Sequence, residues 1–237
     1  MVSIGLIKMN LITNIIEKIT PSHKVGTIPK IIHYVWVGDT PLNKSGFGKY
    51  WKSWKKYNPD YNFMLWDENN IDFSTPHLKE VYGLKNWAHL ANLVRLQVIY
   101  QYGGIYLDTD MLVIKSFDKL LDNQCFFGFQ LRKHPTHWVN NAVIGATKNH
   151  WFIKKMIDYI IKTYDGSQMA TLAGPVTVTT LLKKEGLKSY SNKGVRVKDI
   201  FIYPVETFYP FWYEERFKKS CIKENTLAIH FWKKRWK

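Results

Sequence analysis

The sequence predicts an α/β domain in which a mostly parallel sheet is flanked by helices. Strand-like and helix-like segments alternate along the chain, an order that is typical of parallel strands joined by helical crossovers. The chain has 237 residues, of which 46% are hydrophobic, and it shows no repeat and no low-complexity tract. This is enough apolar material for one sizeable core, so we expect a single large domain.

Two parts are expected along the chain. An amphipathic helix and a connector occupy residues 1–26, and the domain occupies residues 27–237. The helix is predicted because isoleucine and leucine recur at helical spacing from Ile4 to Ile19, opposite polar residues. Packing on the domain, binding in a membrane interface and binding to a partner all fit this pattern.

The domain is expected to begin with a strand, a helix and a second strand. Residues 28–38 contain a buried apolar strand, residues 48–57 form a helix, and residues 62–66 form the next strand. The pair Asn58-Pro59 stops the helix, because the residue before a proline disfavours helical backbone.

A second helix is predicted over residues 87–102, where apolar residues recur at helical spacing. It ends at Gly103-Gly104, where a left-handed backbone costs little. The strand of residues 105–107 follows directly. Further on, residues 151–164 form a helix with Asn149 as its N-cap.

The chain is strongly basic. Lysine and arginine number 34 against 19 aspartate and glutamate, which gives a formal net charge of +15 and favours anionic partners. Cys125 and Cys221 lack metal-ligand spacing and are too few for a disulfide scaffold, which favours a reducing compartment. The sequence shows neither an apolar run of ~18 residues nor a signal peptide. We therefore expect a cytoplasmic protein, placed peripherally at the inner face of an anionic membrane.

The most informative stretch is YGGIYLDTDML, residues 102–112, where an apolar strand ends in two aspartates. On an extended backbone Asp108 and Asp110 would point the same way, roughly 7 Å apart. Open α/β sheets bind ligands at the carboxyl ends of their strands. A hard divalent ion such as Mg²⁺ or Mn²⁺ would relieve the repulsion between the carboxylates and leave positions for phosphate oxygens. A metal-bound diphosphate is the leading hypothesis, against a purely solvated acidic turn.

Three chemistries use such carboxylates: glycosyl transfer from a nucleotide sugar, phosphatase chemistry of the haloacid dehalogenase type, and glycoside hydrolysis. The phosphatase motif requires Thr or Val at the position of Leu112 and a later acidic pair at a strand end, and the sequence has neither. Hydrolase carboxylates normally come from separate strands. A basic nucleic-acid-binding protein is the non-enzyme alternative, since 16% of the residues are aromatic. No nucleic-acid-binding module is recognisable in the chain, so no nucleic acid partner is expected.

Six stretches together resemble glycosyltransferase family 32, the DXD sugar-binding proteins. They are IPKIIHYVWVG, SWKKYNPDYNFMLWDENN, the helix with Arg95 that runs into YGGIYLDTD, NNAVIGATKNHWF, AGP and AIHFW. The family includes Och1-like mannosyltransferases and bacterial capsular polysaccharide glycosyltransferases, and it is distantly similar to the clostridial glucosylating toxins. The matches run in order from Ile28 to Trp236.

The resemblance implies a GT-A catalytic domain and a Mn²⁺ or Mg²⁺ cofactor. It also implies retaining transfer of a hexose or N-acetylhexosamine from a nucleotide diphosphate sugar to a glycan or lipid-linked saccharide, and we favour a UDP-sugar. By the same resemblance, Asp110 coordinates the metal, Asp108 holds the sugar or ribose and the metal's water, and Arg95 contacts the donor. His230 would complete the metal sphere.

The resemblance also implies donor contacts at Val35, Trp36, Asn92 and Gly174, and Trp36 would stack on the base. From its residue type and position, the amide of Asn141 would read sugar hydroxyls or serve a turn. The indole of Trp236 and the basic residues around it predict a C-terminal lid over the diphosphate. Three structural roles stay open as alternatives: Trp36 fills the core, Arg95 forms a structural ion pair, and Gly174-Pro175 starts a helix. Relatives commonly have Asp where this chain has Asn92.

Overall fold

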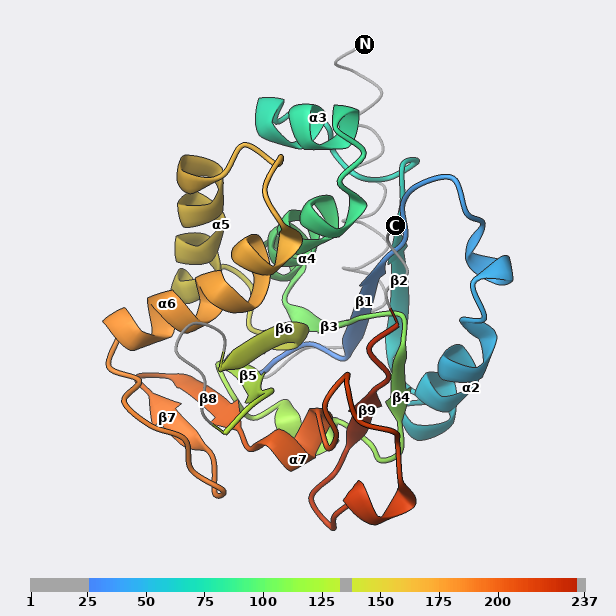
Figure 1. Cartoon of the computed structure of the whole chain (residues 1–237), viewed down its shortest axis with the longest axis vertical. Coiled ribbons are helices and arrows are strands. Elements are labelled where there is room, and N and C mark those ends of the chain that lie inside the picture. The colour runs from blue at the N-terminus through green and yellow to red at the C-terminus, as the bar shows by residue number, and fades with distance from the viewer. Residues whose placement is uncertain (1–25, 133–137, 234–237) are drawn as a thin grey trace.

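The computed structural model describes residues 26–132 and 138–233. The predicted N-terminal helix and Trp236 therefore lie outside the described residues. Within these residues, a seven-stranded sheet has the order β2-β1-β3-β6-β5-β8-β7, and β4 pairs with β9 in a small second sheet (Figure 1). The strands are β1 (Ile31–Val35), β2 (Asn62–Trp66), β3 (Gly104–Leu107), β4 (Met111–Val113), β5 (Cys125–Phe129), β6 (Val139–Ala146), β7 (Val195–Val197), β8 (Ile200–Tyr203) and β9 (Ala228–His230).

The α/β class is confirmed, but the large sheet is mixed rather than mostly parallel. β1 runs parallel to β2 and β3, and β5 runs parallel to β8. β6 is antiparallel to both β3 and β5, and β7 is antiparallel to β8. The short link of residues 130–138 between β5 and β6 explains part of the difference, because a parallel pair needs a longer crossover connection.

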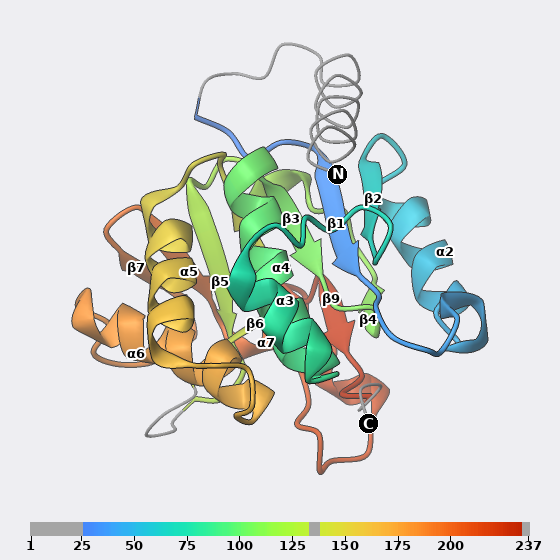
Figure 2. The same cartoon turned by 90° about the horizontal axis from the view of Figure 1, so that it is seen from above.

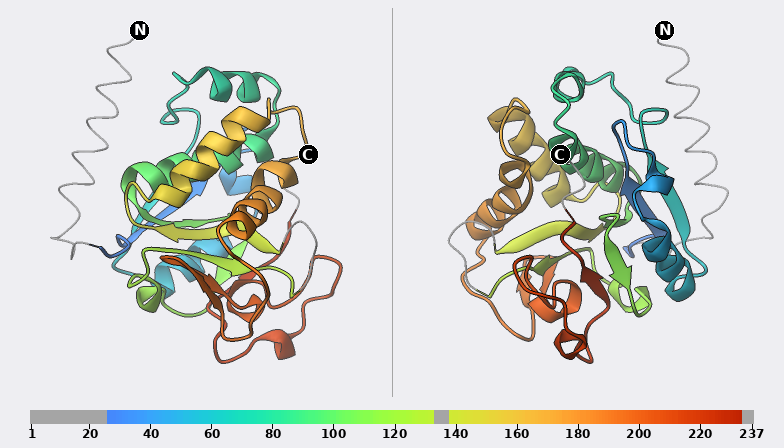
Figure 3. Two further views of the ribbon diagram at one scale, coloured as in Figure 1. Left: turned by 90° about the vertical axis from the view of Figure 1, so that its left-hand side faces the viewer. Right: turned by 45° about the vertical axis from the view of Figure 1, so that its right-hand side comes forward.

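Helices cover both faces of the large sheet. The described α-helices are α2 (Gly48–Tyr57), α3 (Pro76–Gly83), α4 (Trp87–Tyr102), α5 (Trp151–Thr163), α6 (Thr177–Lys184) and α7 (Val205–Phe208), and the shorter turns are η1 (Leu42–Lys44), η2 (Asp118–Leu120), η3 (Leu172–Val176) and η4 (Lys219–Cys221). α4 and α5 lie together on one face (Figure 3, left). α2 packs on β4 beside the other face, and it lies at the opposite edge of the sheet from α6 and β7 (Figure 2).

The predicted boundaries of α2, β2 and α4 agree with the structure, and α5 ends one residue earlier than expected. The predicted N-cap of α5 is wrong. His150 caps this helix, since its Nδ1 accepts a hydrogen bond from the backbone N–H of Phe152 at 3.2 Å. Asn149 instead has a φ of 60°, a left-handed conformation that asparagine tolerates better than most residues.

The turn from α4 into β3 depends on a glycine. Gly104 has a φ of +105°, and a Cβ placed there would lie 2.8 Å from the carbonyl oxygen of Ile31. This close approach lets β3 pair with β1 immediately after the helix. The end of β3, where Asp108 stands, is thereby held beside the end of β1.

His33 in β1 is fully buried and neutral. Its Nδ1 accepts a hydrogen bond from the Trp66 indole N–H at 3.0 Å, so its Nε2 carries the proton and donates to the carbonyl of Gly103 at 2.8 Å. Burial lowers the pKa of His33 to about 4.

We expect His33 to make stability depend on pH. The unfolded chain takes up a proton below about pH 6.5 and the folded chain does not, so stability is lost as the pH falls from about 6.5 towards 4. The loss attributable to this residue should approach about 3 kcal/mol. Urea unfolding of the wild type and of His33→Gln at several pH values measures it. Equal pH dependence of the two proteins would contradict the assignment, because His89 and His150, whose pKa values burial also lowers, are present in both.

Candidate active site

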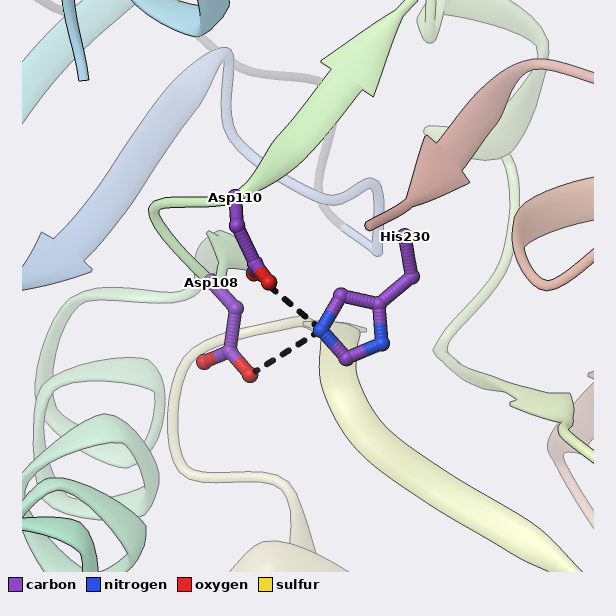
Figure 4. A group of neighbouring side chains, drawn as sticks. All are labelled: Asp108, Asp110 and His230. Carbon is purple, nitrogen blue, oxygen red and sulfur yellow. Dashed lines mark ion pairs between the residues drawn. The ribbon is translucent and has the colours of Figure 1, made fainter. Parts of the chain in front are cut away.

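Asp108 and Asp110 flank Thr109 in a tight turn between β3 and β4. The backbone N–H of Met111 donates to the carbonyl of Asp108 at 3.1 Å, so the extended backbone assumed from the sequence is wrong at this point. The turn nevertheless brings both carboxylates to one spot at the carboxyl end of β3 (Figure 4).

His230 reaches the two aspartates from the far end of the chain. β9 pairs with β4 in a register that places His230 opposite Met111. The His230 Nε2 lies 3.1 Å from Asp110 Oδ1 and 3.9 Å from Asp108 Oδ2. The other oxygen of Asp110 accepts a hydrogen bond from the backbone N–H of Lys233 at 2.6 Å.

Arg95 faces Asp108 from the interior. Its Nη1 lies 3.2 Å from Asp108 Oδ1 and donates to the carbonyl of Asn141 at 2.7 Å. Burial raises the pKa of Asp108, although Arg95 and His230 oppose this effect. Burial alone would lower the pKa of His230, but the two carboxylates outweigh it and the pKa is raised. The turn is therefore a coupled group of two acids with two basic neighbours.

Asn92, Asn141 and Gly174 form a buried layer behind this turn. Asn141 Nδ2 donates to Asn92 Oδ1 at 2.8 Å, and Asn92 Nδ2 donates to the carbonyl of Ala170 at 2.8 Å. A carboxylate at position 92 could not donate to that carbonyl, which gives the departure from the family's Asp a structural reason. A Cβ on Gly174 would lie 3.0 Å from Asn141 Oδ1 and 3.2 Å from Asn92 Oδ1, so the AGP segment packs closely on this layer at the glycine.

A cavity of about 560 Å³ opens in front of the turn, a volume typical of small-molecule sites. Among the described residues it is lined by Val35, Tyr106, Asp108, Thr109, Asp110, Gln130, Asn140, Met169, Thr171, Pro175, Trp212, Tyr213, His230, Trp232 and Lys233. The structure thus brings four of the predicted site residues to one cavity, namely Val35, Asp108, Asp110 and His230.

The other predicted site residues are placed differently. Arg95, Asn92, Asn141 and Gly174 lie in the layer behind the cavity, so their donor contacts stay predictions. Trp36 follows β1, is 7% exposed, and donates its indole N–H to the carbonyl of Thr40 at 2.7 Å. Its stacking on a base also stays a prediction.

Sequence reasoning missed the aromatic side of the cavity. Trp212 and Tyr213 come from a stretch, FYPFWYEERF at residues 208–217, in which six of ten residues are aromatic. This high density of aromatic residues beside charged residues could have indicated a binding segment. Nothing in the pattern, however, indicated that the loop would lie next to Asp108.

Two models of glycosyltransferase families match parts of the chain. Residues 45–127, which include the aspartate turn, match the family model described as "Glycosyltransferase sugar-binding region containing DXD motif". Residues 145–237, which include His230, match the model described as "Alpha 1,4-glycosyltransferase conserved region". The two matched segments follow one another along the chain and contain Asp108, Asp110 and His230.

Known glycosyltransferases are similar to this chain over parts of their length. An uncharacterized glycosyltransferase of Acanthamoeba polyphaga mimivirus is 31% identical over 57% of this chain and 55% of its own. Inositol phosphoceramide mannosyltransferase 3 of Schizosaccharomyces pombe is 29% identical over 57% of this chain and 38% of its own. The chain thus spans only part of the length of the curated relatives it matches.

The solved structure of the PaToxG glycosyltransferase superposes with a TM-score of 0.55 at 23% identity, over 77% of this chain and 78% of that one. This likeness supports the fold alone. The expected GT-A-type α/β fold is confirmed.

The residues of the aspartate turn and His230 fit a divalent cation. Asp108, Asp110 and His230 each offer one ligand atom, and these atoms all lie within 4.8 Å of one another. Two carboxylate oxygens and an imidazole nitrogen are donors that Mn²⁺ accepts well. His230 Nδ1 is buried and has no hydrogen-bond partner among the described residues. The structure adds one detail: the amide of Lys233 occupies one oxygen of Asp110, so the other oxygen faces His230.

Proposed function

We propose that this chain is a retaining, metal-dependent glycosyltransferase that transfers a hexose or N-acetylhexosamine from a UDP-sugar to a glycan or lipid-linked saccharide. The observation that carries the proposal is the convergence of Asp108, Asp110 and His230 in the lining of a cavity of about 560 Å³. The match of the surrounding segment to a DXD sugar-binding region supports it.

Each residue has a role in this proposal. Mn²⁺ or Mg²⁺ held by the three side chains would neutralise charge on the nucleotide diphosphate as it leaves. Arg95 is a positioning residue, because it fixes Asp108 through a buried ion pair. The Lys233 amide orients the carboxylate of Asp110. Val35 lines the cavity at the end of β1, which supports a nucleotide contact there.

The stereochemical proposal has a separate basis. The second family model describes α-1,4-glycosyltransferases, and the usual UDP-hexose donors carry an α-linked sugar. Transfer to an α product would retain the configuration. The name of the S. pombe relative, an inositol phosphoceramide mannosyltransferase, supports a lipid-linked acceptor as one of the possibilities to test.

A nucleotide panel tests the donor and the metal together. UDP with Mn²⁺ should stabilise the protein by about 2.7 kcal/mol at roughly 100 times its dissociation constant. UDP with a chelator should not, and neither should GDP with Mn²⁺. Release of UDP from UDP-sugars is the matching activity assay. Stabilisation by UDP that is independent of metal would contradict the metal proposal, and preference for GDP would contradict the choice of base.

The proposal also places the protein at an anionic membrane surface. Between Pro41 and Tyr57 the chain has five lysines and no acidic residue. Four of these lysines lie on α2 and all five are exposed, which supports electrostatic attraction to anionic lipid headgroups. Within residues 26–132 and 138–233, no helix has the length and apolar content to cross a bilayer.

Vesicle sedimentation tests this contact. The exchange of Lys49, Lys52, Lys55 and Lys56 together for alanine should weaken binding to phosphatidylcholine vesicles containing phosphatidylglycerol by at least about 100-fold, since each lysine near the surface contributes about 1 kcal/mol. The matched control exchanges four exposed lysines at the opposite edge of the sheet, Lys183, Lys184, Lys188 and Lys193. Equal losses of vesicle binding in both variants would contradict a specific contact through α2, because binding would then depend on net charge alone.

A further inference from the structure

One side of the cavity is a wall of three aromatic side chains. Trp212 and Tyr213 come from the loop after α7, and Trp232 follows β9. The ring centroids of Trp212 and Tyr213 are 4.7 Å apart, and those of Trp212 and Trp232 are 5.0 Å apart. All three line the cavity that also contains the aspartate turn.

Packing against the core accounts for Trp232 but not for Trp212 and Tyr213. Trp212 and Tyr213 are in neither of the two buried apolar clusters that the described residues form. Tyr213 is 49% exposed, and Met169, which lines the same cavity, is 75% exposed. Large apolar side chains gathered at one opening are more informative than scattered ones, because they mark a surface that a ligand covers.

The wall is also held in a defined arrangement. The Glu215 carboxylate accepts a hydrogen bond from the Trp212 backbone N–H at 2.9 Å, and the Trp232 indole donates to the carbonyl of Phe211 at 2.8 Å. Trp232 has a φ of 54°, a left-handed conformation that costs free energy for a bulky residue and that clusters at functional sites. The rings are thus positioned before any ligand arrives.

The wall adjoins the metal-ligand group, because the ring centroids of Trp232 and His230 are 4.2 Å apart, and Trp212 packs on the Trp232 ring. The metal-ligand group suits a nucleotide diphosphate, so a group bound on Trp212 would lie next to the donor. The wall offers flat π faces, which attract the weakly positive C–H groups on one face of a sugar ring. Thr171 lines the same cavity and has a hydroxyl, and the hydrogen-bonded amides of Gln130 and Asn140 make this part of the lining polar. A pyranose, apolar on one face and polar at its edge, matches both features.

We propose that Trp212 and Tyr213 form the acceptor subsite, on which the terminal sugar ring of a saccharide acceptor stacks. This inference rests on the proposed function, since an acceptor exists only if the chain transfers a sugar. It assigns the aromatic wall to the acceptor and leaves the aspartate turn to the donor. The exposed thioether of Met169 contacts the part of the acceptor that extends out of the cavity.

The test separates donor from acceptor. Trp212→Ala and Tyr213→Ala should each lower kcat/KM for the acceptor by about 10- to 100-fold. Hydrolysis of UDP-sugar without an acceptor, and affinity for UDP with Mn²⁺, should stay within about twofold of the wild type. The matched control is Trp51→Ala, which removes a half-buried tryptophan of α2 outside the cavity lining. This variant should change none of the three readouts.

The acceptor itself is identified on an array of glycans and glycolipid headgroups in the presence of UDP and Mn²⁺. The array reports binding without turnover.

The outcomes are distinct. A wild type that releases no UDP from any UDP-sugar, with or without the glycans that bind on the array, contradicts the proposed function, and glycan binding that depends on Trp212 would then show a saccharide-binding site that is not an acceptor subsite. Loss of UDP affinity in Trp212→Ala would overturn the inference, because the wall would then bind the nucleotide. Unchanged acceptor kinetics, or a wild type that hydrolyses donor but binds no glycan on the array, would overturn it too.

Discussion

Replacing Asp110 by alanine should lower the rate of sugar transfer by at least about 10³-fold, or about 4 kcal/mol of barrier, and leave the protein folded. Asp110 is 4% exposed and shares its carboxylate between His230 and the amide of Lys233. Its removal would take one of three ligand groups from the site. It would also relieve the repulsion with Asp108, which works in favour of folding.

Activity and metal affinity should be measured on the same samples. The matched control is Asp122→Ala, which removes an exposed acid and should keep full activity. Cooperative thermal unfolding of Asp110→Ala shows that the variant is folded. A folded variant with normal transfer rates would contradict the role of the aspartate pair, whereas loss of activity in the control as well would indicate a general effect of charge.

Replacing Arg95 by alanine should damage both stability and catalysis. Arg95 is 5% exposed, and its guanidinium makes the ion pair with Asp108, donates to the carbonyls of Ala91 and Asn141, and lies 4.4 Å from the centroid of the Tyr106 ring. Without it, the pKa of Asp108 would rise further, because burial already raises it and Arg95 opposes this effect. The Asp108 side chain is 27% exposed, so the loss of this partly buried pair should cost about 2 kcal/mol, and the misplaced carboxyl group should lower the transfer rate by about 100-fold.

Denaturant unfolding and steady-state kinetics measure the two effects separately. Arg132→Ala is the matched control, because Arg132 pairs with Glu206 at the surface and is 67% exposed; it should cost less than about 1 kcal/mol. Arg95→Lys keeps the charge but not the fixed fork of donors, so it should recover stability better than activity. Full transfer activity in Arg95→Ala would contradict the role of Arg95 in positioning Asp108.

Much of the local structure could be predicted because it depends on neighbours along the chain. α2, β2 and α4 match their predicted boundaries, since each has a clear apolar period and a strong stop signal such as Asn58-Pro59 or Gly103-Gly104. The position of Asp108 at the end of β3 followed from the same local reading. The N-cap of α5 was missed because Asn149 and His150 are both able to accept the capping hydrogen bond, and the backbone angles choose between them.

The sequence by itself determined the α/β class, the main elements and the aspartate pair as the centre of the site. The tertiary structure alone decided the direction of β6, the tight turn that joins the two aspartates, the buried layer of Asn92 and Asn141 behind them, and the meeting of Asp110 with Trp212 and His230 in one cavity. The physical reason is the range of the interactions. Side-chain period and turn chemistry act over a few residues, whereas these contacts join residues far apart in the chain, and many pairings of the same elements would satisfy the local pattern equally well.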